Sequence, residues 1–74
     1  MQVKVLKVRE IKTKTGENGK IRRYRSALID YQDGIHAELK VLTDDVIKPE
    51  DVVVGMTADM RVDEKGFVTV FEKV

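Results

Sequence analysis

The chain has 74 residues, one histidine, no cysteine and a net charge of +1. This length predicts a single domain, residues 1–74, with a core close to the smallest that folds without covalent or metal support. The absence of cysteine excludes disulfide bonds and cysteine-based zinc sites, and His36 cannot build a metal site alone, so we expect no cofactor. No apolar run is long enough to span a membrane and no signal peptide is apparent, so we expect a cytoplasmic protein without a membrane partner.

The charge is distributed unevenly along the chain. Residues 1–25 hold nine cations against two acids, a net charge of +7, whereas residues 26–74 hold five cations against eleven acids, a net charge of −6. Such asymmetry indicates a polyanionic partner for the basic half. The alternative is that the two halves form neighbouring strands, whose charges pair across the sheet.

The first predicted strand covers residues 3–11, where apolar and charged residues alternate. Its apolar side chains change face halfway along, from Val3 and Val5 to Leu6 and Val8. This switch predicts a bulged or coiled strand that serves both sides of a small barrel.

A basic hairpin follows the first strand. Gly16 and Gly19 are expected to supply the positive φ angles of its turn. The strand that leaves the turn, residues 20–31, is basic on both faces in its first half and has Ala27 and Ile29 on one face in its second half. We therefore expect it to begin as an arm projecting from the barrel and to enter the core near Ala27.

The clearest alternation in the chain follows Asp33-Gly34, a dipeptide that is typical of hairpin turns. Residues 35–43 form the predicted third strand, and Leu42 interrupts its pattern. The predicted inward face is apolar and holds Ile35, Ala37, Leu39 and Val41. The predicted outward face is polar and holds His36, Glu38 and Lys40.

The rest of the chain predicts an irregular connection and a second hairpin. In residues 43–55, Thr43 and the two acids after it can cap a helical turn, and Pro49 limits that turn to a short length. Strands are predicted at residues 56–63 and 67–74, around a turn that ends at Gly66. The inward residues of this hairpin are expected to be Met56, Ala58, Met60, Val62 and Phe71.

These elements predict an all-β fold, a five-stranded OB-fold-like barrel with a short irregular or helical connection between strands 3 and 4. Five strands in so short a chain favour a closed or nearly closed barrel, which removes exposed edges. The alternative is an SH3-like barrel, which lacks the long first pair of strands.

The basic hairpin is the strongest functional signal. Lysine and arginine neutralise phosphates, and an aromatic ring stacks on bases of any sequence, so the pattern is typical of single-stranded nucleic-acid binding. The alternative is a solubilising loop. The predicted nucleic-acid-binding residues are Lys12, Lys14, Lys20, Arg22, Arg23, Tyr24, Arg25 and Phe67.

Three stretches, in their order and spacing, resemble filamentous-phage single-stranded DNA-binding proteins. They are Gly19-Lys20 followed by Tyr24, the run 46–49 (Val-Ile-Lys-Pro), and the turn 63–67 that ends in Phe67. The resemblance implies an OB-like barrel that binds single-stranded DNA in phage or plasmid replication, in the cytoplasm of an infected bacterium, as a homodimer. It also implies phosphate contacts for the hairpin cations Lys12, Lys14, Lys20 and Arg22, stacking for Tyr24, and a second hairpin around Phe67.

Catalysis has little support in the sequence. The adjacent carboxylates Asp44-Asp45 and Asp63-Glu64 lie where caps and turns explain them, and we expect no enzyme activity. The predicted function is sequence-tolerant binding of single-stranded DNA. RNA binding by the same fold and a protein-interaction or assembly module are the alternatives, and the sequence leaves open which face of the strand at 20–31 meets the ligand.

Overall fold

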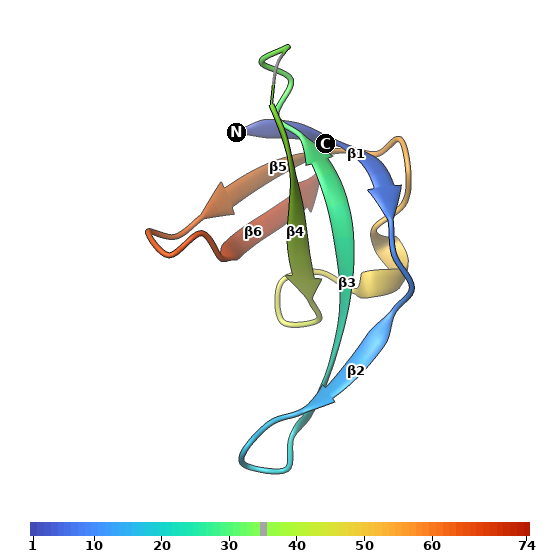
Figure 1. The fold of residues 1–74 in the computed structure, drawn as a ribbon, viewed down its shortest axis with the longest axis vertical. Coiled ribbons are helices and arrows are strands. Elements are labelled where there is room, and N and C mark those ends of the chain that lie inside the picture. The colour runs from blue at the N-terminus through green and yellow to red at the C-terminus, as the bar shows by residue number, and fades with distance from the viewer. Residues whose placement is uncertain (35) are drawn as a thin grey trace.

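The computed structural model describes residues 1–34 and 36–74, which form six strands and one short 3-10 helix (Figure 1). None of the helical structure in these ranges is long and apolar enough to cross a membrane. The elements in chain order are β1 (Gln2–Val8), β2 (Lys12–Thr15), β3 (Ile21–Asp30), β4 (Ala37–Thr43), η1 (Pro49–Asp51), β5 (Thr57–Val62) and β6 (Val68–Lys73).

The strands form one antiparallel sheet that curls into a half-barrel. Its hydrogen-bonded order is β2-β3-β1-β5-β6, and β4 pairs with the other edge of β3 (Figure 1). β1 and β2 pair with successive parts of the same strand, β3. The predicted first strand, residues 3–11, ends earlier than expected, at Val8, and β2 is a separate strand within the predicted hairpin. The predicted OB-like order is thereby confirmed, and η1 is the short connection before the fourth strand of the barrel.

A bulge in β1 keeps its apolar side chains on the core side. The pairing of β1 with β3 shifts register between Val5 and Lys7, as the change of face in the sequence predicted. Val3 and Val5 are buried, and Val8 returns to pack against the same core after the bulge. Leu6, predicted to share a face with Val8, is instead exposed at the bulge.

The core lies inside the curl of the sheet and is entirely apolar among the described residues. The hairpin prediction holds for Met56, Ala58, Met60 and Phe71 and fails for Val62, because a register shift between Arg61 and Val62 turns Val62 toward solvent. The core residues are Val3, Val5, Ala27, Ile29, Leu42, Val52, Met56, Ala58, Met60 and Phe71.

The prediction for β4 is wrong about which face points inward. Leu39 and Val41, predicted to be in the core, are 48% and 50% exposed, whereas Leu42 is fully buried. Lys40, predicted to point outward, is largely covered, and Ala37 is exposed. Ile35 was predicted inward as well and lies outside the described residues.

The pairing of β4 with β3 explains this reversal. Directly paired residues of antiparallel strands share a face of the sheet. Lys40 pairs with Ala27 and Leu42 pairs with Arg25, so they lie on the side of β3 that faces the core. Leu39 pairs with Leu28 on the opposite side and points outward.

The two leucines of β4 provide a direct test of this arrangement. Replacing buried Leu42 by alanine removes core contacts and leaves a cavity, so we expect a loss of about 2–5 kcal/mol in the free energy of unfolding. Leu39→Ala removes the same atoms from an exposed face and should cost under about 1 kcal/mol. Urea denaturation of both variants measures the difference, and a larger loss for Leu39→Ala would contradict the register.

Candidate nucleic-acid interface

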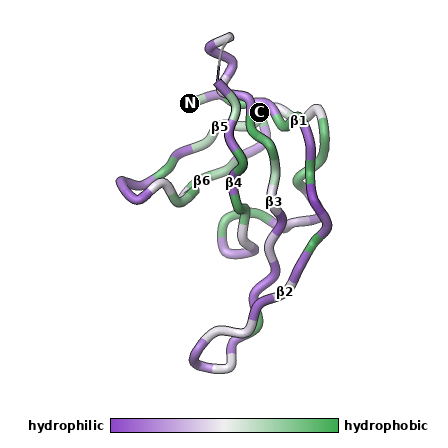
Figure 2. The backbone as a smooth tube through the Cα atoms, in the orientation of Figure 1, coloured by the Kyte–Doolittle hydropathy of each residue, from purple (hydrophilic) through white to green (hydrophobic). Residues whose placement is uncertain are grey.

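The arm formed by β2 and the first half of β3 extends away from the barrel (Figure 1). Much of its length is coloured as hydrophilic in Figure 2. Its turn is closed by two backbone bonds, in which the N–H of Gly16 donates to the carbonyl of Lys20 at 2.8 Å and the N–H of Gly19 donates to that of Gly16 at 3.0 Å. Gly19 has a φ of 76°, whereas Gly16, contrary to the prediction, does not have a positive φ.

One face of β2, β3 and β4 holds four of the seven predicted hairpin residues. Lys14 pairs with Arg22, Lys12 pairs with Tyr24, and Tyr24 pairs in turn with Thr43 on β4. Because paired residues share a face, these side chains form one continuous surface, which we call the outer face. It comprises Lys7, Lys12, Lys14, Arg22, Tyr24, Ser26, Leu28, Leu39, Val41 and Thr43.

Three shallow depressions lie along this face, from the second half of β3 to the turn between β5 and β6. The first is lined by Lys7, Val8, Arg9, Ser26, Leu28 and Leu39. The second is lined by Lys14, Arg22, Tyr24, Val41 and Thr43. The third is lined by Val41, Thr43, Asp45, Val46, Phe67 and Val68, so it shares two residues with the second and continues it toward Phe67.

Several cations at this surface are available to a ligand. Within residues 1–34 and 36–74, no carboxylate lies in ion-pair distance of Lys7, Arg9, Lys12, Lys14 or Lys20. Arg22 approaches the Oδ2 of Asp45 at 3.4 Å, but both side chains are about half exposed. Exposed pairs of this kind contribute only about 0–1 kcal/mol, so Arg22 can exchange partners at little cost.

Arg23 and Arg25 lie on the opposite face of β3 and bind their own chain. The guanidinium of Arg23 forms a two-pronged ion pair with Glu50 on η1, and this hydrogen bond and charge lower the pKa of Glu50. Arg25 Nη1 donates to the carbonyl of Val52 at 2.9 Å. The alternative of charge pairing between the two halves of the chain therefore holds on this face, and these two predicted residues are not part of the outer face.

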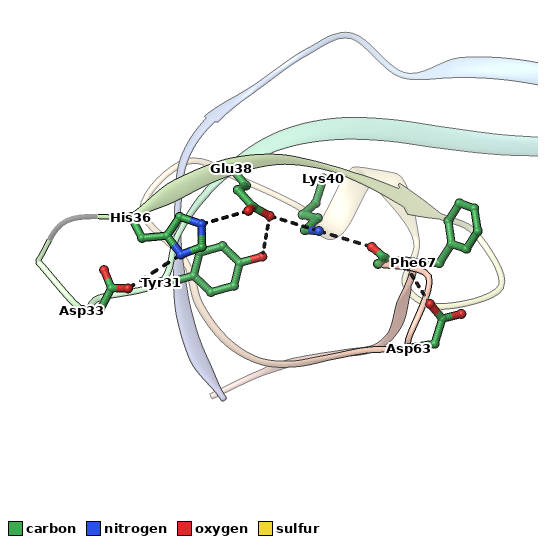
Figure 3. Close-up of polar contacts among 8 residues, drawn as sticks. Tyr31, Asp33, His36, Glu38, Lys40, Asp63 and Phe67 are labelled. Carbon is green, nitrogen blue, oxygen red and sulfur yellow. Dashed lines mark hydrogen bonds and ion pairs between the residues drawn. The ribbon is translucent and has the colours of Figure 1, made fainter.

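Phe67 is held at the end of the β5–β6 turn and is 68% exposed. The carboxylate of Asp63 accepts a hydrogen bond from the backbone N–H of Phe67 at 2.9 Å (Figure 3). It also accepts one from the backbone N–H of Lys65 at 2.9 Å. Figure 3 shows the Phe67 ring beside the end of β4. The ring is therefore available for stacking at the third depression.

A lysine connects this turn to β4 across the open side of the barrel. Lys40 Nζ donates to the carbonyl of Gly66 at 3.2 Å and to Glu38 Oε2 at 3.2 Å (Figure 3). Within the described part of the chain, no backbone pairing joins β4 to β6. Lys40 thus supplies a polar link where a closed barrel would have ladder hydrogen bonds.

Glu38 is the centre of a small polar network beside this link. It accepts from His36 Nε2 at 2.8 Å and from the Tyr31 hydroxyl at 3.2 Å, and the rings of Tyr31 and His36 stack at 4.4 Å (Figure 3). Hydrogen bonds from His36 and Lys40 lower the pKa of Glu38. Partial burial opposes the charged form of Lys40, but its hydrogen bond to Glu38 leaves the pKa of Lys40 above the ordinary value.

Sequence reasoning missed six residues of the outer face, namely Lys7, Ser26, Leu28, Leu39, Val41 and Thr43, and also Arg9 in the first depression. The Asp33-Gly34 turn contained a signal that could have identified three of them, Leu39, Val41 and Thr43. A two-residue hairpin at Asp33-Gly34 pairs Tyr31 with His36, which fixes the register of the two strands. That register places Leu39, Val41 and Thr43 on the face of Tyr24.

Comparisons with known proteins add no relative to this picture. No protein-family model, curated protein or solved structure matches the chain. Among the described residues, no group of three or more histidine, aspartate or glutamate side chains is arranged to hold a metal ion. The outer face itself is therefore the feature that bears on function.

Replacing Lys40 tests its role as the link to the second hairpin. Lys40→Met keeps the apolar stem and removes the ammonium group that holds the Gly66 carbonyl. We expect faster amide hydrogen exchange at Gly66 and Phe67. Lys65→Met, which removes an exposed lysine from the same turn, is the matched control, and equal exchange in the two variants would contradict the link.

The polar network also predicts a pH dependence of stability. Because the pKa of Glu38 is lowered in the folded chain, its contribution is present above the ordinary pKa of 4.5 and is lost as the pH falls through the depressed value. Glu38→Gln removes this titration, so the difference in unfolding free energy between the two proteins should shrink as the pH falls below 4.5. Thermal unfolding between about pH 7 and pH 3 measures it, and a constant difference would be the contrary result.

Proposed function

We propose that this protein is a non-catalytic, sequence-tolerant binder of single-stranded DNA and that the strand lies along the outer face. The observation that carries the proposal is the register around Tyr24, which places Lys12 on one side of the ring and Thr43 on the other, with Lys14 and Arg22 next to them. A half-buried ring beside unpaired lysines suits a strand of phosphates and bases.

The chemistry of the outer face separates two kinds of contact. Lys7, Arg9, Lys12 and Lys14 can neutralise phosphates, and the release of counterions makes such binding weaken steeply with salt. Tyr24 and Phe67 offer ring surfaces on which bases stack, each stack contributing about 1–3 kcal/mol. The exposed apolar residues of β4 between them provide a floor for further bases.

Double-stranded DNA fits this surface less well. The common sequence-reading motifs insert a helix into the major groove. The described residues contain one helical segment, η1, and it packs on the other side of β3 through the Arg23–Glu50 pair. The proposal includes RNA as the alternative ligand, because no residue of the outer face is assigned to the 2′-hydroxyl.

Two adjacent arginines on β3 give a matched test. Arg22→Gln and Arg23→Gln remove the same charge from opposite faces of one strand. In fluorescence anisotropy titrations of a labelled oligo-dT, Arg22→Gln should weaken binding and lower the slope of log K against log salt by about 0.7, the value for one phosphate of a single strand. Arg23→Gln should leave both quantities close to those of the unaltered protein.

The outcomes distinguish binding at the outer face from non-specific electrostatic attraction to the whole protein. Equal effects of the two substitutions would indicate attraction without a defined face. No binding of oligo-dT at low salt would overturn the proposal. The same titration with oligo-U compares RNA with DNA on identical bases apart from the thymine methyl group.

The second candidate function is a protein-interaction or assembly module, and the exposure of Leu39 and Val41 on β4 favours it. These apolar side chains lie on a strand whose outer edge has no partner in the described residues. A homodimer through this edge is part of the same proposal, because free strand edges invite pairing. Light scattering with and without oligonucleotide distinguishes a self-associating module from a monomer that binds nucleic acid.

A further inference from the structure

The third depression differs from the other two because a carboxylate lines it. Its walls are the apolar side chains Val41, Val46, Phe67 and Val68, and its polar groups come from Thr43 and Asp45. The Thr43 hydroxyl bonds to Asp45, which lowers the pKa of Asp45 and keeps it ionised at neutral pH. A fixed negative charge repels phosphate, so the backbone of a bound strand is not the group that enters here.

The two polar residues together present a specific pattern of hydrogen-bonding groups. In the free chain the Thr43 hydroxyl donates its one proton to Asp45 Oδ1. When the hydroxyl rotates to donate to a base instead, both oxygens of the Asp45 carboxylate become available as acceptors beside it. This sequence of one donor and two acceptors is complementary to the pairing edge of guanine, which has the acceptor O6 followed by the donors N1–H and N2–H. Unpaired bases in single strands are commonly read on this edge.

The other bases match this pattern less well. Thymine has one donor, N3–H, between two carbonyl oxygens, and one of those oxygens would face the carboxylate. Cytosine and adenine each present a single amino group beside an acceptor nitrogen. Guanine is the base that places two donors side by side, which lets it bind a carboxylate in the two-pronged manner that gives good discrimination.

We propose that the depression between β4 and the β5–β6 turn is a guanine subsite, in which the base stacks on Phe67 and its pairing edge bonds to Thr43 and Asp45. The inference rests on the proposed function and refines it at a single nucleotide. The weak contact of Arg22 with Asp45, at 3.4 Å, is exchanged when the base binds. Arg22 can then bind a neighbouring phosphate. Binding of the base therefore gives Asp45 and Arg22 each a partner in the nucleic acid.

The test compares oligonucleotides that differ at one base. Fluorescence anisotropy is measured with labelled dT12 and with the same strand carrying one central dG, a length and composition that avoid guanine self-assembly. The protein should bind the strand with dG about tenfold more tightly, within the range for a two-pronged base contact. Replacing the guanine by hypoxanthine, which lacks the 2-amino group, should lose most of that gain.

Two aspartate variants assign the preference to Asp45. Asp45→Asn keeps the size of the side chain but replaces one acceptor by a donor, and it should bind the two strands equally. Asp44→Asn removes the same charge from the neighbouring residue, whose carboxylate instead accepts from the backbone N–H of Arg23, and it should keep the tenfold preference.

Each result has a defined meaning. Loss of the preference in Asp45→Asn but not in Asp44→Asn supports the subsite. Equal binding of both strands by the unaltered protein, or a preference that survives Asp45→Asn, overturns the guanine subsite and leaves the proposed function in place. Failure to bind either strand at low salt overturns the proposed function together with the inference that rests on it.

Discussion

The pairing register of β3 is the constraint on which the rest of the structure depends. This strand pairs with β2, β1 and β4, and each pairing decides which of its neighbours' side chains share a face with it. A shift of one residue in any of them would move a whole set of side chains to the other side of the sheet. The core face at Ala27 and Ile29 and the outer face at Tyr24 are two consequences of the same register.

The register also divides the positive charge of the first 25 residues into two uses. Arg22 and Arg23 are neighbours in sequence and point to opposite sides of β3. Arg23 binds Glu50 and holds the η1 connection against the strand, whereas Arg22 has only a weak partner. The uneven charge of the sequence therefore reflects two structural roles, one that fastens the acidic half of the chain and one that remains available to a ligand.

The sequence predicts the elements of this fold better than their orientation. Alternation and turn residues place the strands, the projecting arm and the short connection at Pro49, because these depend on local chemistry. The inward face of β4 is predicted wrongly because both of its faces carry apolar side chains, so alternation alone cannot distinguish Leu39 from Leu42. The deciding information is the pairing with β3, which follows from the Asp33-Gly34 turn rather than from the strand itself.

The candidate site, like the fold, is only partly predictable from the sequence. The hairpin residues Lys12, Lys14 and Tyr24 are recognisable from composition, but Thr43 and Asp45 stand in a segment where the sequence predicts only a capped helical turn. The chain has two tyrosines and two phenylalanines, so under the proposed function a strand would be attracted largely by cations, which do not distinguish one base from another. Discrimination between bases therefore requires a group that phosphate avoids. On this face that group is a carboxylate beside an exposed ring, and its place at the end of β4 follows from the register that brings Thr43 alongside Tyr24.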